Sequence, residues 1–176
     1  MNKRLLLIPS IFFLFILSIF FYLLVIDRDP AELPSNLLNK NVPIFETKSL
    51  IKNKKFNSSE EFNNEIVLVN FFATWCKPCL DEHSYIKLLS NKDKIRVVGI
   101  NYKDNPKKTK EWLKKLGNPY SDVIEDKEGR LAIDWGVYGI PETFIINSRG
   151  IIKYRHVGPV TKEIYKKFKL IIAELT

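Results

Sequence analysis

The segment Trp75-Cys76-Lys77-Pro78-Cys79 constrains this chain most, because it contains the only two cysteines and directly follows an apolar run. That run, residues 66–72, is rich in β-branched and aromatic residues, which predicts a buried strand. Apolar residues at helical spacing after Cys79 predict a helix. The cysteines therefore lie where a central strand ends and a helix begins. Free backbone N–H groups and the positive end of the helix dipole favour a thiolate there.

This placement predicts a thiol–disulfide exchange site. Cys76, at the helix start, is the expected attacking thiol, and Cys79, one helical turn later, is the expected resolving thiol. Trp75 is a bulky neighbour, and Lys77 adds positive charge that should favour the thiolate. Pro78 removes an N–H that the first helical turn does not need. Because the cysteine pair itself is the redox centre, we expect no cofactor and no metal.

Three other interpretations of the cysteine pair are possible. Cys76, Cys79 and His83 could be part of a zinc site, but a closed site needs four ligands and the only other histidine, His156, is far along the chain. Haem attachment requires a histidine directly after the second cysteine, and Leu80 stands there. The third alternative is an inert structural disulfide, although a bridge that closes so small a loop adds little to the stability of a fold.

The charge of the chain does not indicate a nucleic-acid partner. The chain has 176 residues and a formal net charge of +8, much of it from lysines dispersed on predicted helix faces. No basic stretch is interleaved with stacking aromatic residues in the pattern of a known nucleic-acid-binding motif, so we expect no nucleic-acid binding. A hydrophobic fraction of 45% and a charged fraction of 27% fit a globular domain.

The N-terminus has the features of a membrane anchor. Residues 5–26 form an uncharged run of 22 residues, long enough to cross a hydrocarbon core. Lys3 and Arg4 precede the run and predict a cytoplasmic segment 1–4. The polar stretch 27–41 is then a linker to a domain, residues 42–176, outside the cytoplasm. The alternative is a cleaved signal peptide, but this run exceeds the roughly 7–15 residues usual there and no small-x-small site follows.

Strands and helices alternate along the predicted domain. This order is typical of an α/β fold, a central mixed sheet flanked by helices with strands joined by crossover helices, and a final hairpin adds an antiparallel edge. The predicted strands are 42–47, 54–56, 66–72, 95–100, 120–124, 143–146 and 151–155. The predicted helices are a short one capped by Ser58 or Ser59, one after Cys79, one from Asn105 to Gly117, one from 126 or 127 to 135, and one capped by Thr161 and running to about 175.

The segment from Gly136 to Thr143 is the second informative motif. Its glycines precede a proline at the start of a strand, which predicts a cis bond between Ile140 and Pro141. Beside the cysteines, the backbone of Ile140 could then pair with an extended substrate segment. The alternative is a trans proline that only starts an edge strand.

Residues 72–79 and 139–144 resemble the thioredoxin superfamily. Longer segments are similar to the membrane-anchored thiol:disulfide interchange proteins of the DsbE/CcmG family, reductases of cytochrome c maturation. The resemblance covers nearly the whole predicted domain and includes the anchor. The segments that carry it are 79–83, 99–104, 112–120, 136–144 and 150–156.

The resemblance implies a thioredoxin-like fold and a single-pass protein of the bacterial inner membrane with its domain in the periplasm. It implies reduction of the apocytochrome c disulfide, directly or through a partner thiol protein, before haem attachment. Electrons would come from a membrane thiol transporter of the DsbD/CcdA kind. A general periplasmic disulfide oxidase or isomerase, or a non-catalytic apocytochrome or haem chaperone, stays open as an alternative.

The resemblance also implies that two acidic residues, Glu82 and Glu142, shape the thiol environment. A carboxylate near Cys76 disfavours the thiolate, which would make the dithiol a better reductant. Ile140 departs from the family pattern, in which a smaller residue such as alanine is expected before the proline. We expect its β-branched side chain to narrow access to Cys76.

Overall fold

The computed structural model describes residues 3–25, 37–52 and 54–176, and within the first range the side chains of residues 9–23. The chain forms two separate units, Met1–Glu32 and Leu33–Thr176. The first contains helix α1, Lys3–Val25. Within the described part of the chain, no helix meets the length and apolarity needed to cross a membrane. Residues 1–2 of the predicted cytoplasmic segment, residue 26 of the predicted anchor and residues 27–36 of the predicted linker lie outside the described residues.

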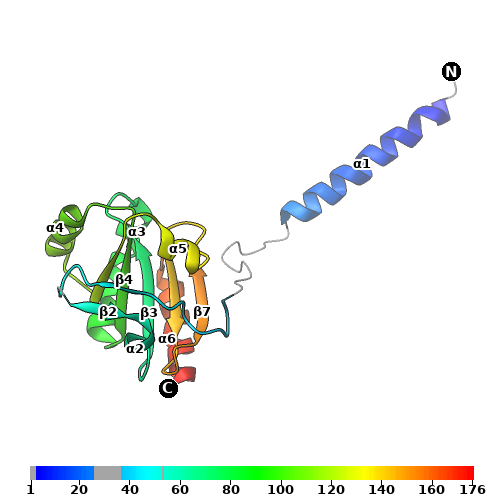
Figure 1. Ribbon diagram of the computed structural model, residues 1–176. Helices are drawn as coiled ribbons and strands as arrows, with labels where there is room; N and C mark the ends of the chain where they lie inside the picture. The colour runs from blue at the N-terminus through cyan, green and yellow to red at the C-terminus, as the bar shows by residue number, and fades with distance from the viewer. Residues whose placement is uncertain (1–2, 26–36, 53) are drawn as a thin grey trace. The chain divides into compact units, whose positions relative to one another are not determined.

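A five-stranded sheet in the order β5-β4-β3-β6-β7 forms the centre of the second unit (Figure 1). Strand β3, Val67–Phe72, pairs in parallel with β4, Arg96–Tyr102, which pairs in parallel with β5, Asp122–Asp126. Strand β6, Glu142–Ile146, is antiparallel to both β3 and β7, Ile152–Val157. This mixed sheet confirms the predicted α/β class, and both predicted hairpin strands are present.

Three helices cover the face of the sheet on which the cysteines lie. They are α3, Lys77–Lys87, α4, Pro106–Leu116, and α6, Lys162–Leu175. Buried side chains from all three form one cluster with residues of β3, and both cysteines belong to it. A single π-helical turn, η2, Leu88–Lys92, extends α3 and was not predicted. Every residue of β3 is buried, because helices and loops cover both of its faces.

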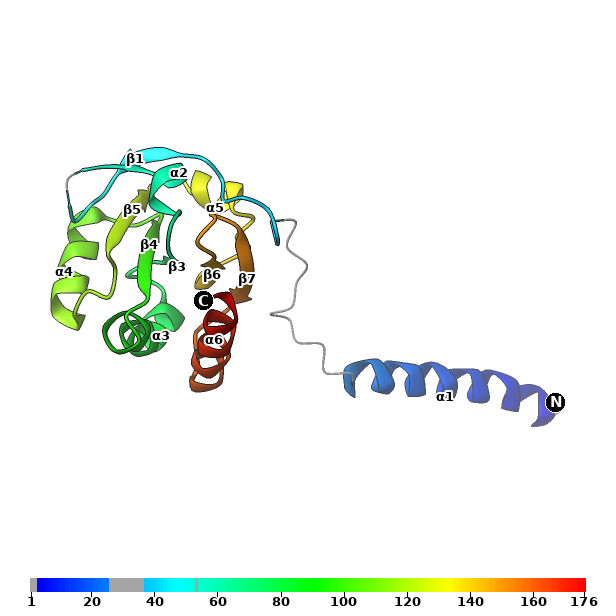
Figure 2. The ribbon, with the colours of Figure 1, turned by 90° about the horizontal axis from the view of Figure 1, so that it is seen from below.

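The opposite face is covered by the N-terminal part of the domain and by one short helix (Figure 2). A separate two-stranded sheet forms there from β1, Glu46–Lys48, and β2, Lys55–Asn57. Helix α2, Ser58–Glu61, follows β2, and α5, Arg130–Asp134, lies between β5 and β6 in the chain. Five large aromatic residues pack into the core on this side. They are Phe56, Phe62, Phe71, Trp135 and Phe144.

Helix ends show where sequence reasoning succeeded and failed. Asn105 caps α4, Gly117 ends it at φ 85°, and Thr161 caps α6, as predicted. The expected cap of α2 was wrong, because the Asn57 side chain accepts the N–H of Ser59. The Ser58 hydroxyl instead accepts the N–H of Phe45 and donates to the carbonyl of Pro43, both before β1. Helix α5 begins later than predicted. The Asp126 carboxylate accepts the N–H groups of residues 131 and 132, which fixes the start of the helix after the turn at residue 129.

Candidate active site

Cys76 and Cys79 form a disulfide at the start of α3, with their Cα atoms 5.3 Å apart. Cys76 is the N-cap residue, and its Sγ accepts the N–H of Cys79 at 3.2 Å. Pro78 lies in the first helical turn, as predicted. Cys76 is the more exposed of the two, at 5% against 2%. Cys76 is therefore the more accessible sulfur for a partner, and it lies where the helix N-terminus favours a thiolate.

The loop before β6 lies against this disulfide. The bond between Ile140 and Pro141 is cis, as predicted. The carbonyl oxygen of Ile140 lies 3.7 Å from Cys76 Sγ, and Pro141 is buried. The Ile140 side chain is half-buried and packs against both core clusters, so only part of it remains to narrow access to Cys76.

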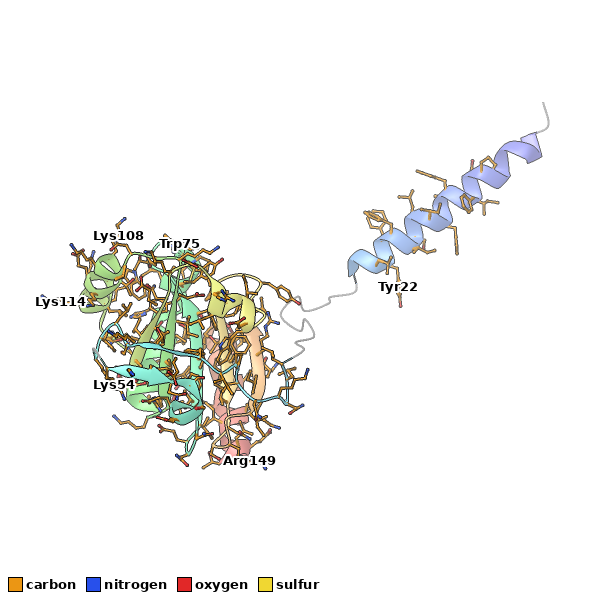
Figure 3. All side chains as sticks on the ribbon, in the orientation of Figure 1. Tyr22, Lys54, Trp75, Lys108, Lys114 and Arg149 are labelled. Carbon is orange, nitrogen blue, oxygen red and sulfur yellow. A yellow bond between two sulfur atoms is a disulfide. The ribbon has the colours of Figure 1, made fainter. Side chains whose placement is uncertain are left out.

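Lys77 does not direct its charge at the thiols. Its ammonium group pairs with Asp81, one helical turn later, and the side chain is largely exposed. The structure therefore does not support the expectation that Lys77 favours the thiolate, because Asp81 and solvent share its charge. Trp75 is 58% exposed and lies at one end of the domain (Figure 3), where its Nε1 donates to the carbonyl of Lys103 at 3.2 Å. The exposed indole is thus held in place directly before Cys76.

Asp104 fixes the loop between β3 and the cysteines. Its carboxylate accepts the backbone N–H of Thr74 at 2.6 Å and the hydroxyl of Thr74 at 2.9 Å. It also accepts from Asn101 and from the N–H of Asn105. Burial raises the pKa of Asp104, but these hydrogen bonds together lower it below its usual value. The sequence analysis missed this residue, since nothing in a linear sequence connects residue 104 with residue 74.

Glu82 lies on the buried face of α3, in a polar network. It follows Cys79 by three residues, so both lie on the same face of α3, and it is only 1% exposed. Its carboxyl group accepts from Asn70 Nδ2 and from the N–H of Val160, each at 2.8 Å. Burial raises the pKa of Glu82 to about 8, although both hydrogen bonds lower it. At neutral pH the group is therefore mostly protonated, next to the resolving cysteine in the helix.

Asn70 connects Glu82 to two further residues that the sequence analysis missed. Its amide also donates to Thr143 Oγ1 at 3.1 Å, and its Oδ1 accepts the hydroxyl of Tyr120 at 2.8 Å. Tyr120 stacks on Phe72 with ring centroids 4.6 Å apart. One signal could have revealed the network, because Asn70 is the single polar residue in the apolar run 66–72. A polar residue buried in a central strand needs hydrogen-bond partners.

Glu142 is buried on the other side of the sheet. In β6 it is paired with Phe71, and both this phenylalanine and Phe144 belong to the cluster on the face away from the cysteines. Its carboxylate accepts from Arg155 at 2.7 and 2.8 Å and from the N–H groups of Tyr138 and Gly139. The geometry does not support a direct action of Glu142 on the thiolate. Glu142 instead holds the loop that leads to Ile140.

His83 is occupied by contacts within the protein. Its Nε2 lies 2.8 Å from the carbonyl oxygen of Gly117, and its ring packs edge-on against Trp112. Burial lowers the pKa of His83, which favours the neutral ring. His83 is thus committed to α4 and the residue that ends it, while Cys76 and Cys79 are bonded to each other.

The raised pKa of Glu82 gives a stability prediction. In the unfolded chain the carboxyl ionises near its usual value of 4.5, whereas in the fold it keeps its proton up to about 8. The folded state thus binds more protons in this window, and the free energy of unfolding should fall by on the order of 3 kcal/mol from about pH 5 to about pH 8. Glu82→Gln should remove this component. Urea denaturation of both oxidised proteins at several pH values measures it, and parallel pH profiles would contradict it.

The comparisons with known proteins agree with this geometry. A family model described as Redoxin matches residues 38–169. The thiol:disulfide interchange protein DsbE of Escherichia coli is 43% identical over 171 residues, which cover 95% of this chain and 92% of that protein. The DsbE protein of Tatumella citrea is 42% identical over 170 residues, which cover 94% of this chain and 91% of that protein. Among solved structures, a thioredoxin-family interchange protein from Chlorobium tepidum has a TM-score of 0.64 at 24% identity and covers 82% of this chain and 99% of its own. A secreted thiol-disulfide isomerase from Corynebacterium glutamicum reaches 0.65 at 21% identity, covering 76% and 85%.

Proposed function

Since the chain belongs to the redoxin family of the thioredoxin superfamily, and is a thiol–disulfide oxidoreductase with Cys76 and Cys79 as its CxxC pair, we propose that it reduces apocytochrome c disulfides before haem attachment. The substrate is the apocytochrome itself or a partner thiol protein of the same maturation process. The long similarity to DsbE proteins supports this assignment over a general oxidase or isomerase.

One observation carries the proposal: the exposed edge of Cys76 at the start of α3, with the Ile140 carbonyl 3.7 Å away. In the reduced protein, the Cys76 thiolate attacks one sulfur of a substrate disulfide. A mixed disulfide forms, and the first substrate thiolate leaves and takes up a proton. Cys79, deprotonated, then attacks Cys76 Sγ, which releases the second substrate thiol. The products are a reduced substrate and the oxidised Cys76–Cys79 pair.

The same site gives roles to its other residues. An extended substrate segment lies along the backbone of Ile140, which orients the substrate sulfur toward Cys76. The pKa of Glu82, about 8, lies close enough to neutral pH for both forms of its carboxyl group to be accessible. In its ionised form Glu82 accepts the proton of the Cys79 thiol as Cys79 attacks Cys76, and it returns this proton when the pair is reduced again. Two electrons and two protons must then restore the dithiol, and a membrane thiol transporter is the proposed donor.

We further propose that residues 5–26 anchor the protein in the bacterial inner membrane, with the domain in the periplasm. The support is the uncharged 22-residue run and the preceding Lys3 and Arg4. An oxidising compartment fits the proposed role, because disulfides form there in substrates and must be reduced before haem is attached.

A deletion strain tests the proposed function. We expect loss of c-type cytochromes, restored by the wild-type gene and by Ser148→Ala, and not restored by Cys76→Ser. Ser148 is an exposed loop residue next to Arg149, which lies at the end of the domain away from Trp75 (Figure 3). Added small-molecule thiol should restore part of the cytochrome content, because the missing component is a reductant. Normal cytochromes after deletion, or equal rescue by Cys76→Ser, would contradict the proposal.

A further inference from the structure

The outer face of α4 is densely basic. The segment 103–117 contains six lysines and only two acidic residues, Asp104 and Glu111. Five of these lysines lie on α4 and all are exposed. Within the described ranges 37–52 and 54–176, none of the five takes part in an ion pair, whereas lysines elsewhere on the domain do. The five, called here the basic face of α4, are Lys107, Lys108, Lys110, Lys114 and Lys115.

The basic face begins beside the residues that precede Cys76. Hydrogen bonds connect the loop before α4 to these residues. The Trp75 indole donates to the Lys103 carbonyl, and the backbone and hydroxyl of Thr74 donate to the Asp104 carboxylate. Helix α4 starts two residues after Asp104. Figure 3 shows Lys108 and Trp75 at the same end of the domain. The start of the basic face therefore lies at the end of the domain that carries Trp75, the residue before Cys76.

The opposite face of α4 fixes the helix to the domain. Leu113 is buried, and the Trp112 ring packs against Phe72 and His83 with centroids 5.8 and 4.4 Å away. At the other end of the helix, Lys87 Nζ donates to the Leu116 carbonyl at 2.7 Å. The basic face thus has a set position relative to the active site. Of the two acidic residues in the segment, Asp104 is committed to the Thr74 loop, which leaves only Glu111 to oppose the lysines.

We propose that the basic face of α4 attracts a redox partner whose reactive cysteine pair is flanked by acidic residues, and orients it toward Cys76. The inference rests on the proposed function, since it needs exchange between two proteins. Fixed charge beside a reactive group raises the rate of encounter with an oppositely charged partner, and salt screens the effect. A partner with basic flanks is repelled by the same surface. The partner class is therefore an acidic protein segment.

Two synthetic peptides test the proposal without knowledge of the natural partner. Both contain one intramolecular Cys-x-x-Cys disulfide and differ only in flanking glutamates or flanking lysines. The reduced full-length protein in neutral detergent should reduce the acidic peptide about tenfold faster than the basic one at low ionic strength. The preference for the acidic peptide should disappear at about 1 M salt.

A charge-reversal variant attributes the preference to α4. Lys107→Glu, Lys108→Glu and Lys110→Glu combined should abolish or invert the preference, and the changes suit folding because acidic residues favour a helix N-terminus. A variant with glutamine at the three positions should give an intermediate result. A control with Lys48→Glu, Lys55→Glu and Lys92→Glu changes the net charge equally at exposed sites outside α4 and should keep the preference. Unchanged reaction of every variant with neutral dithiothreitol shows an intact active site.

Equal rates for the two peptides would overturn the proposal, as would an equal loss of preference in the control variant. Binding to vesicles of anionic phospholipid that depends on the three α4 lysines, together with equal peptide rates, would assign the face to a membrane and also overturn it. These outcomes are independent of the cytochrome assay, because a deletion strain with normal c-type cytochromes leaves the peptide preference unaffected.

Discussion

Cys76→Ser should reduce disulfide exchange to the uncatalysed background, whereas Cys79→Ser should stop the reaction halfway. Serine at residue 76 leaves no thiolate at the start of α3, so the first attack on a substrate cannot occur. With serine at residue 79, Cys76 still attacks, but nothing resolves the mixed disulfide. The measurement is turnover with a peptide disulfide, combined with non-reducing electrophoresis of each variant.

The two variants also separate exchange from passive binding. Cys79→Ser should accumulate a covalent complex through Cys76 in cells, and a reductant should release it. A chaperone that uses the disulfide only as a clasp predicts no such complex and unchanged cytochrome yield for both variants. That pair of results would contradict the account.

Arg155→Met should destabilise the domain by about 3–5 kcal/mol, because it leaves a buried carboxylate without its partner. The side chains of Arg155 and Glu142 are 3% and 0% exposed. The guanidinium group also donates to the Gly136 carbonyl and lies under the Tyr138 ring, 4.6 Å from its centroid. Urea denaturation of the oxidised protein measures the loss.

A second variant separates the unpaired charge from lost packing. Arg155→Met combined with Glu142→Gln should recover a large part of the stability, because no buried charge remains. Both variants should also slow exchange, since both lack the Arg155 bond to the Gly136 carbonyl, in the loop that leads to Ile140. A loss below about 1 kcal/mol for the single variant is the value expected of a solvated pair, and would contradict this description.

Local patterns in the sequence predict most elements of the domain correctly. The run 66–72 is apolar because β3 is covered on both faces, and Asn105, Gly117 and Thr161 mark helix ends by backbone chemistry that acts within a few residues. The cysteines at the junction of β3 and α3 follow from the same reasoning. Such features depend on neighbours in the chain, which a single sequence contains.

The surroundings of the site depend on residues far apart in the sequence, and there prediction was weaker. The resemblance gives Glu82 and Glu142 the same role, yet Glu82 lies on the buried face of α3. Glu142 lies on the other side of the sheet, paired with Arg155. The face on which a carboxylate lies depends on strand register, and its partner depends on the fold. Neither Asp104 nor Tyr120 carries a local signal that connects it to the active site.

The redox potential of the Cys76–Cys79 pair tests the central claim most directly. The full-length protein is equilibrated with glutathione buffers of known redox potential. Thiol alkylation and mass measurement then give the fraction of the protein that is reduced in each buffer. A potential of about −200 mV or lower is expected, because a reductant must give up electrons readily. A potential of about −120 mV, typical of a strong oxidant, would contradict the account.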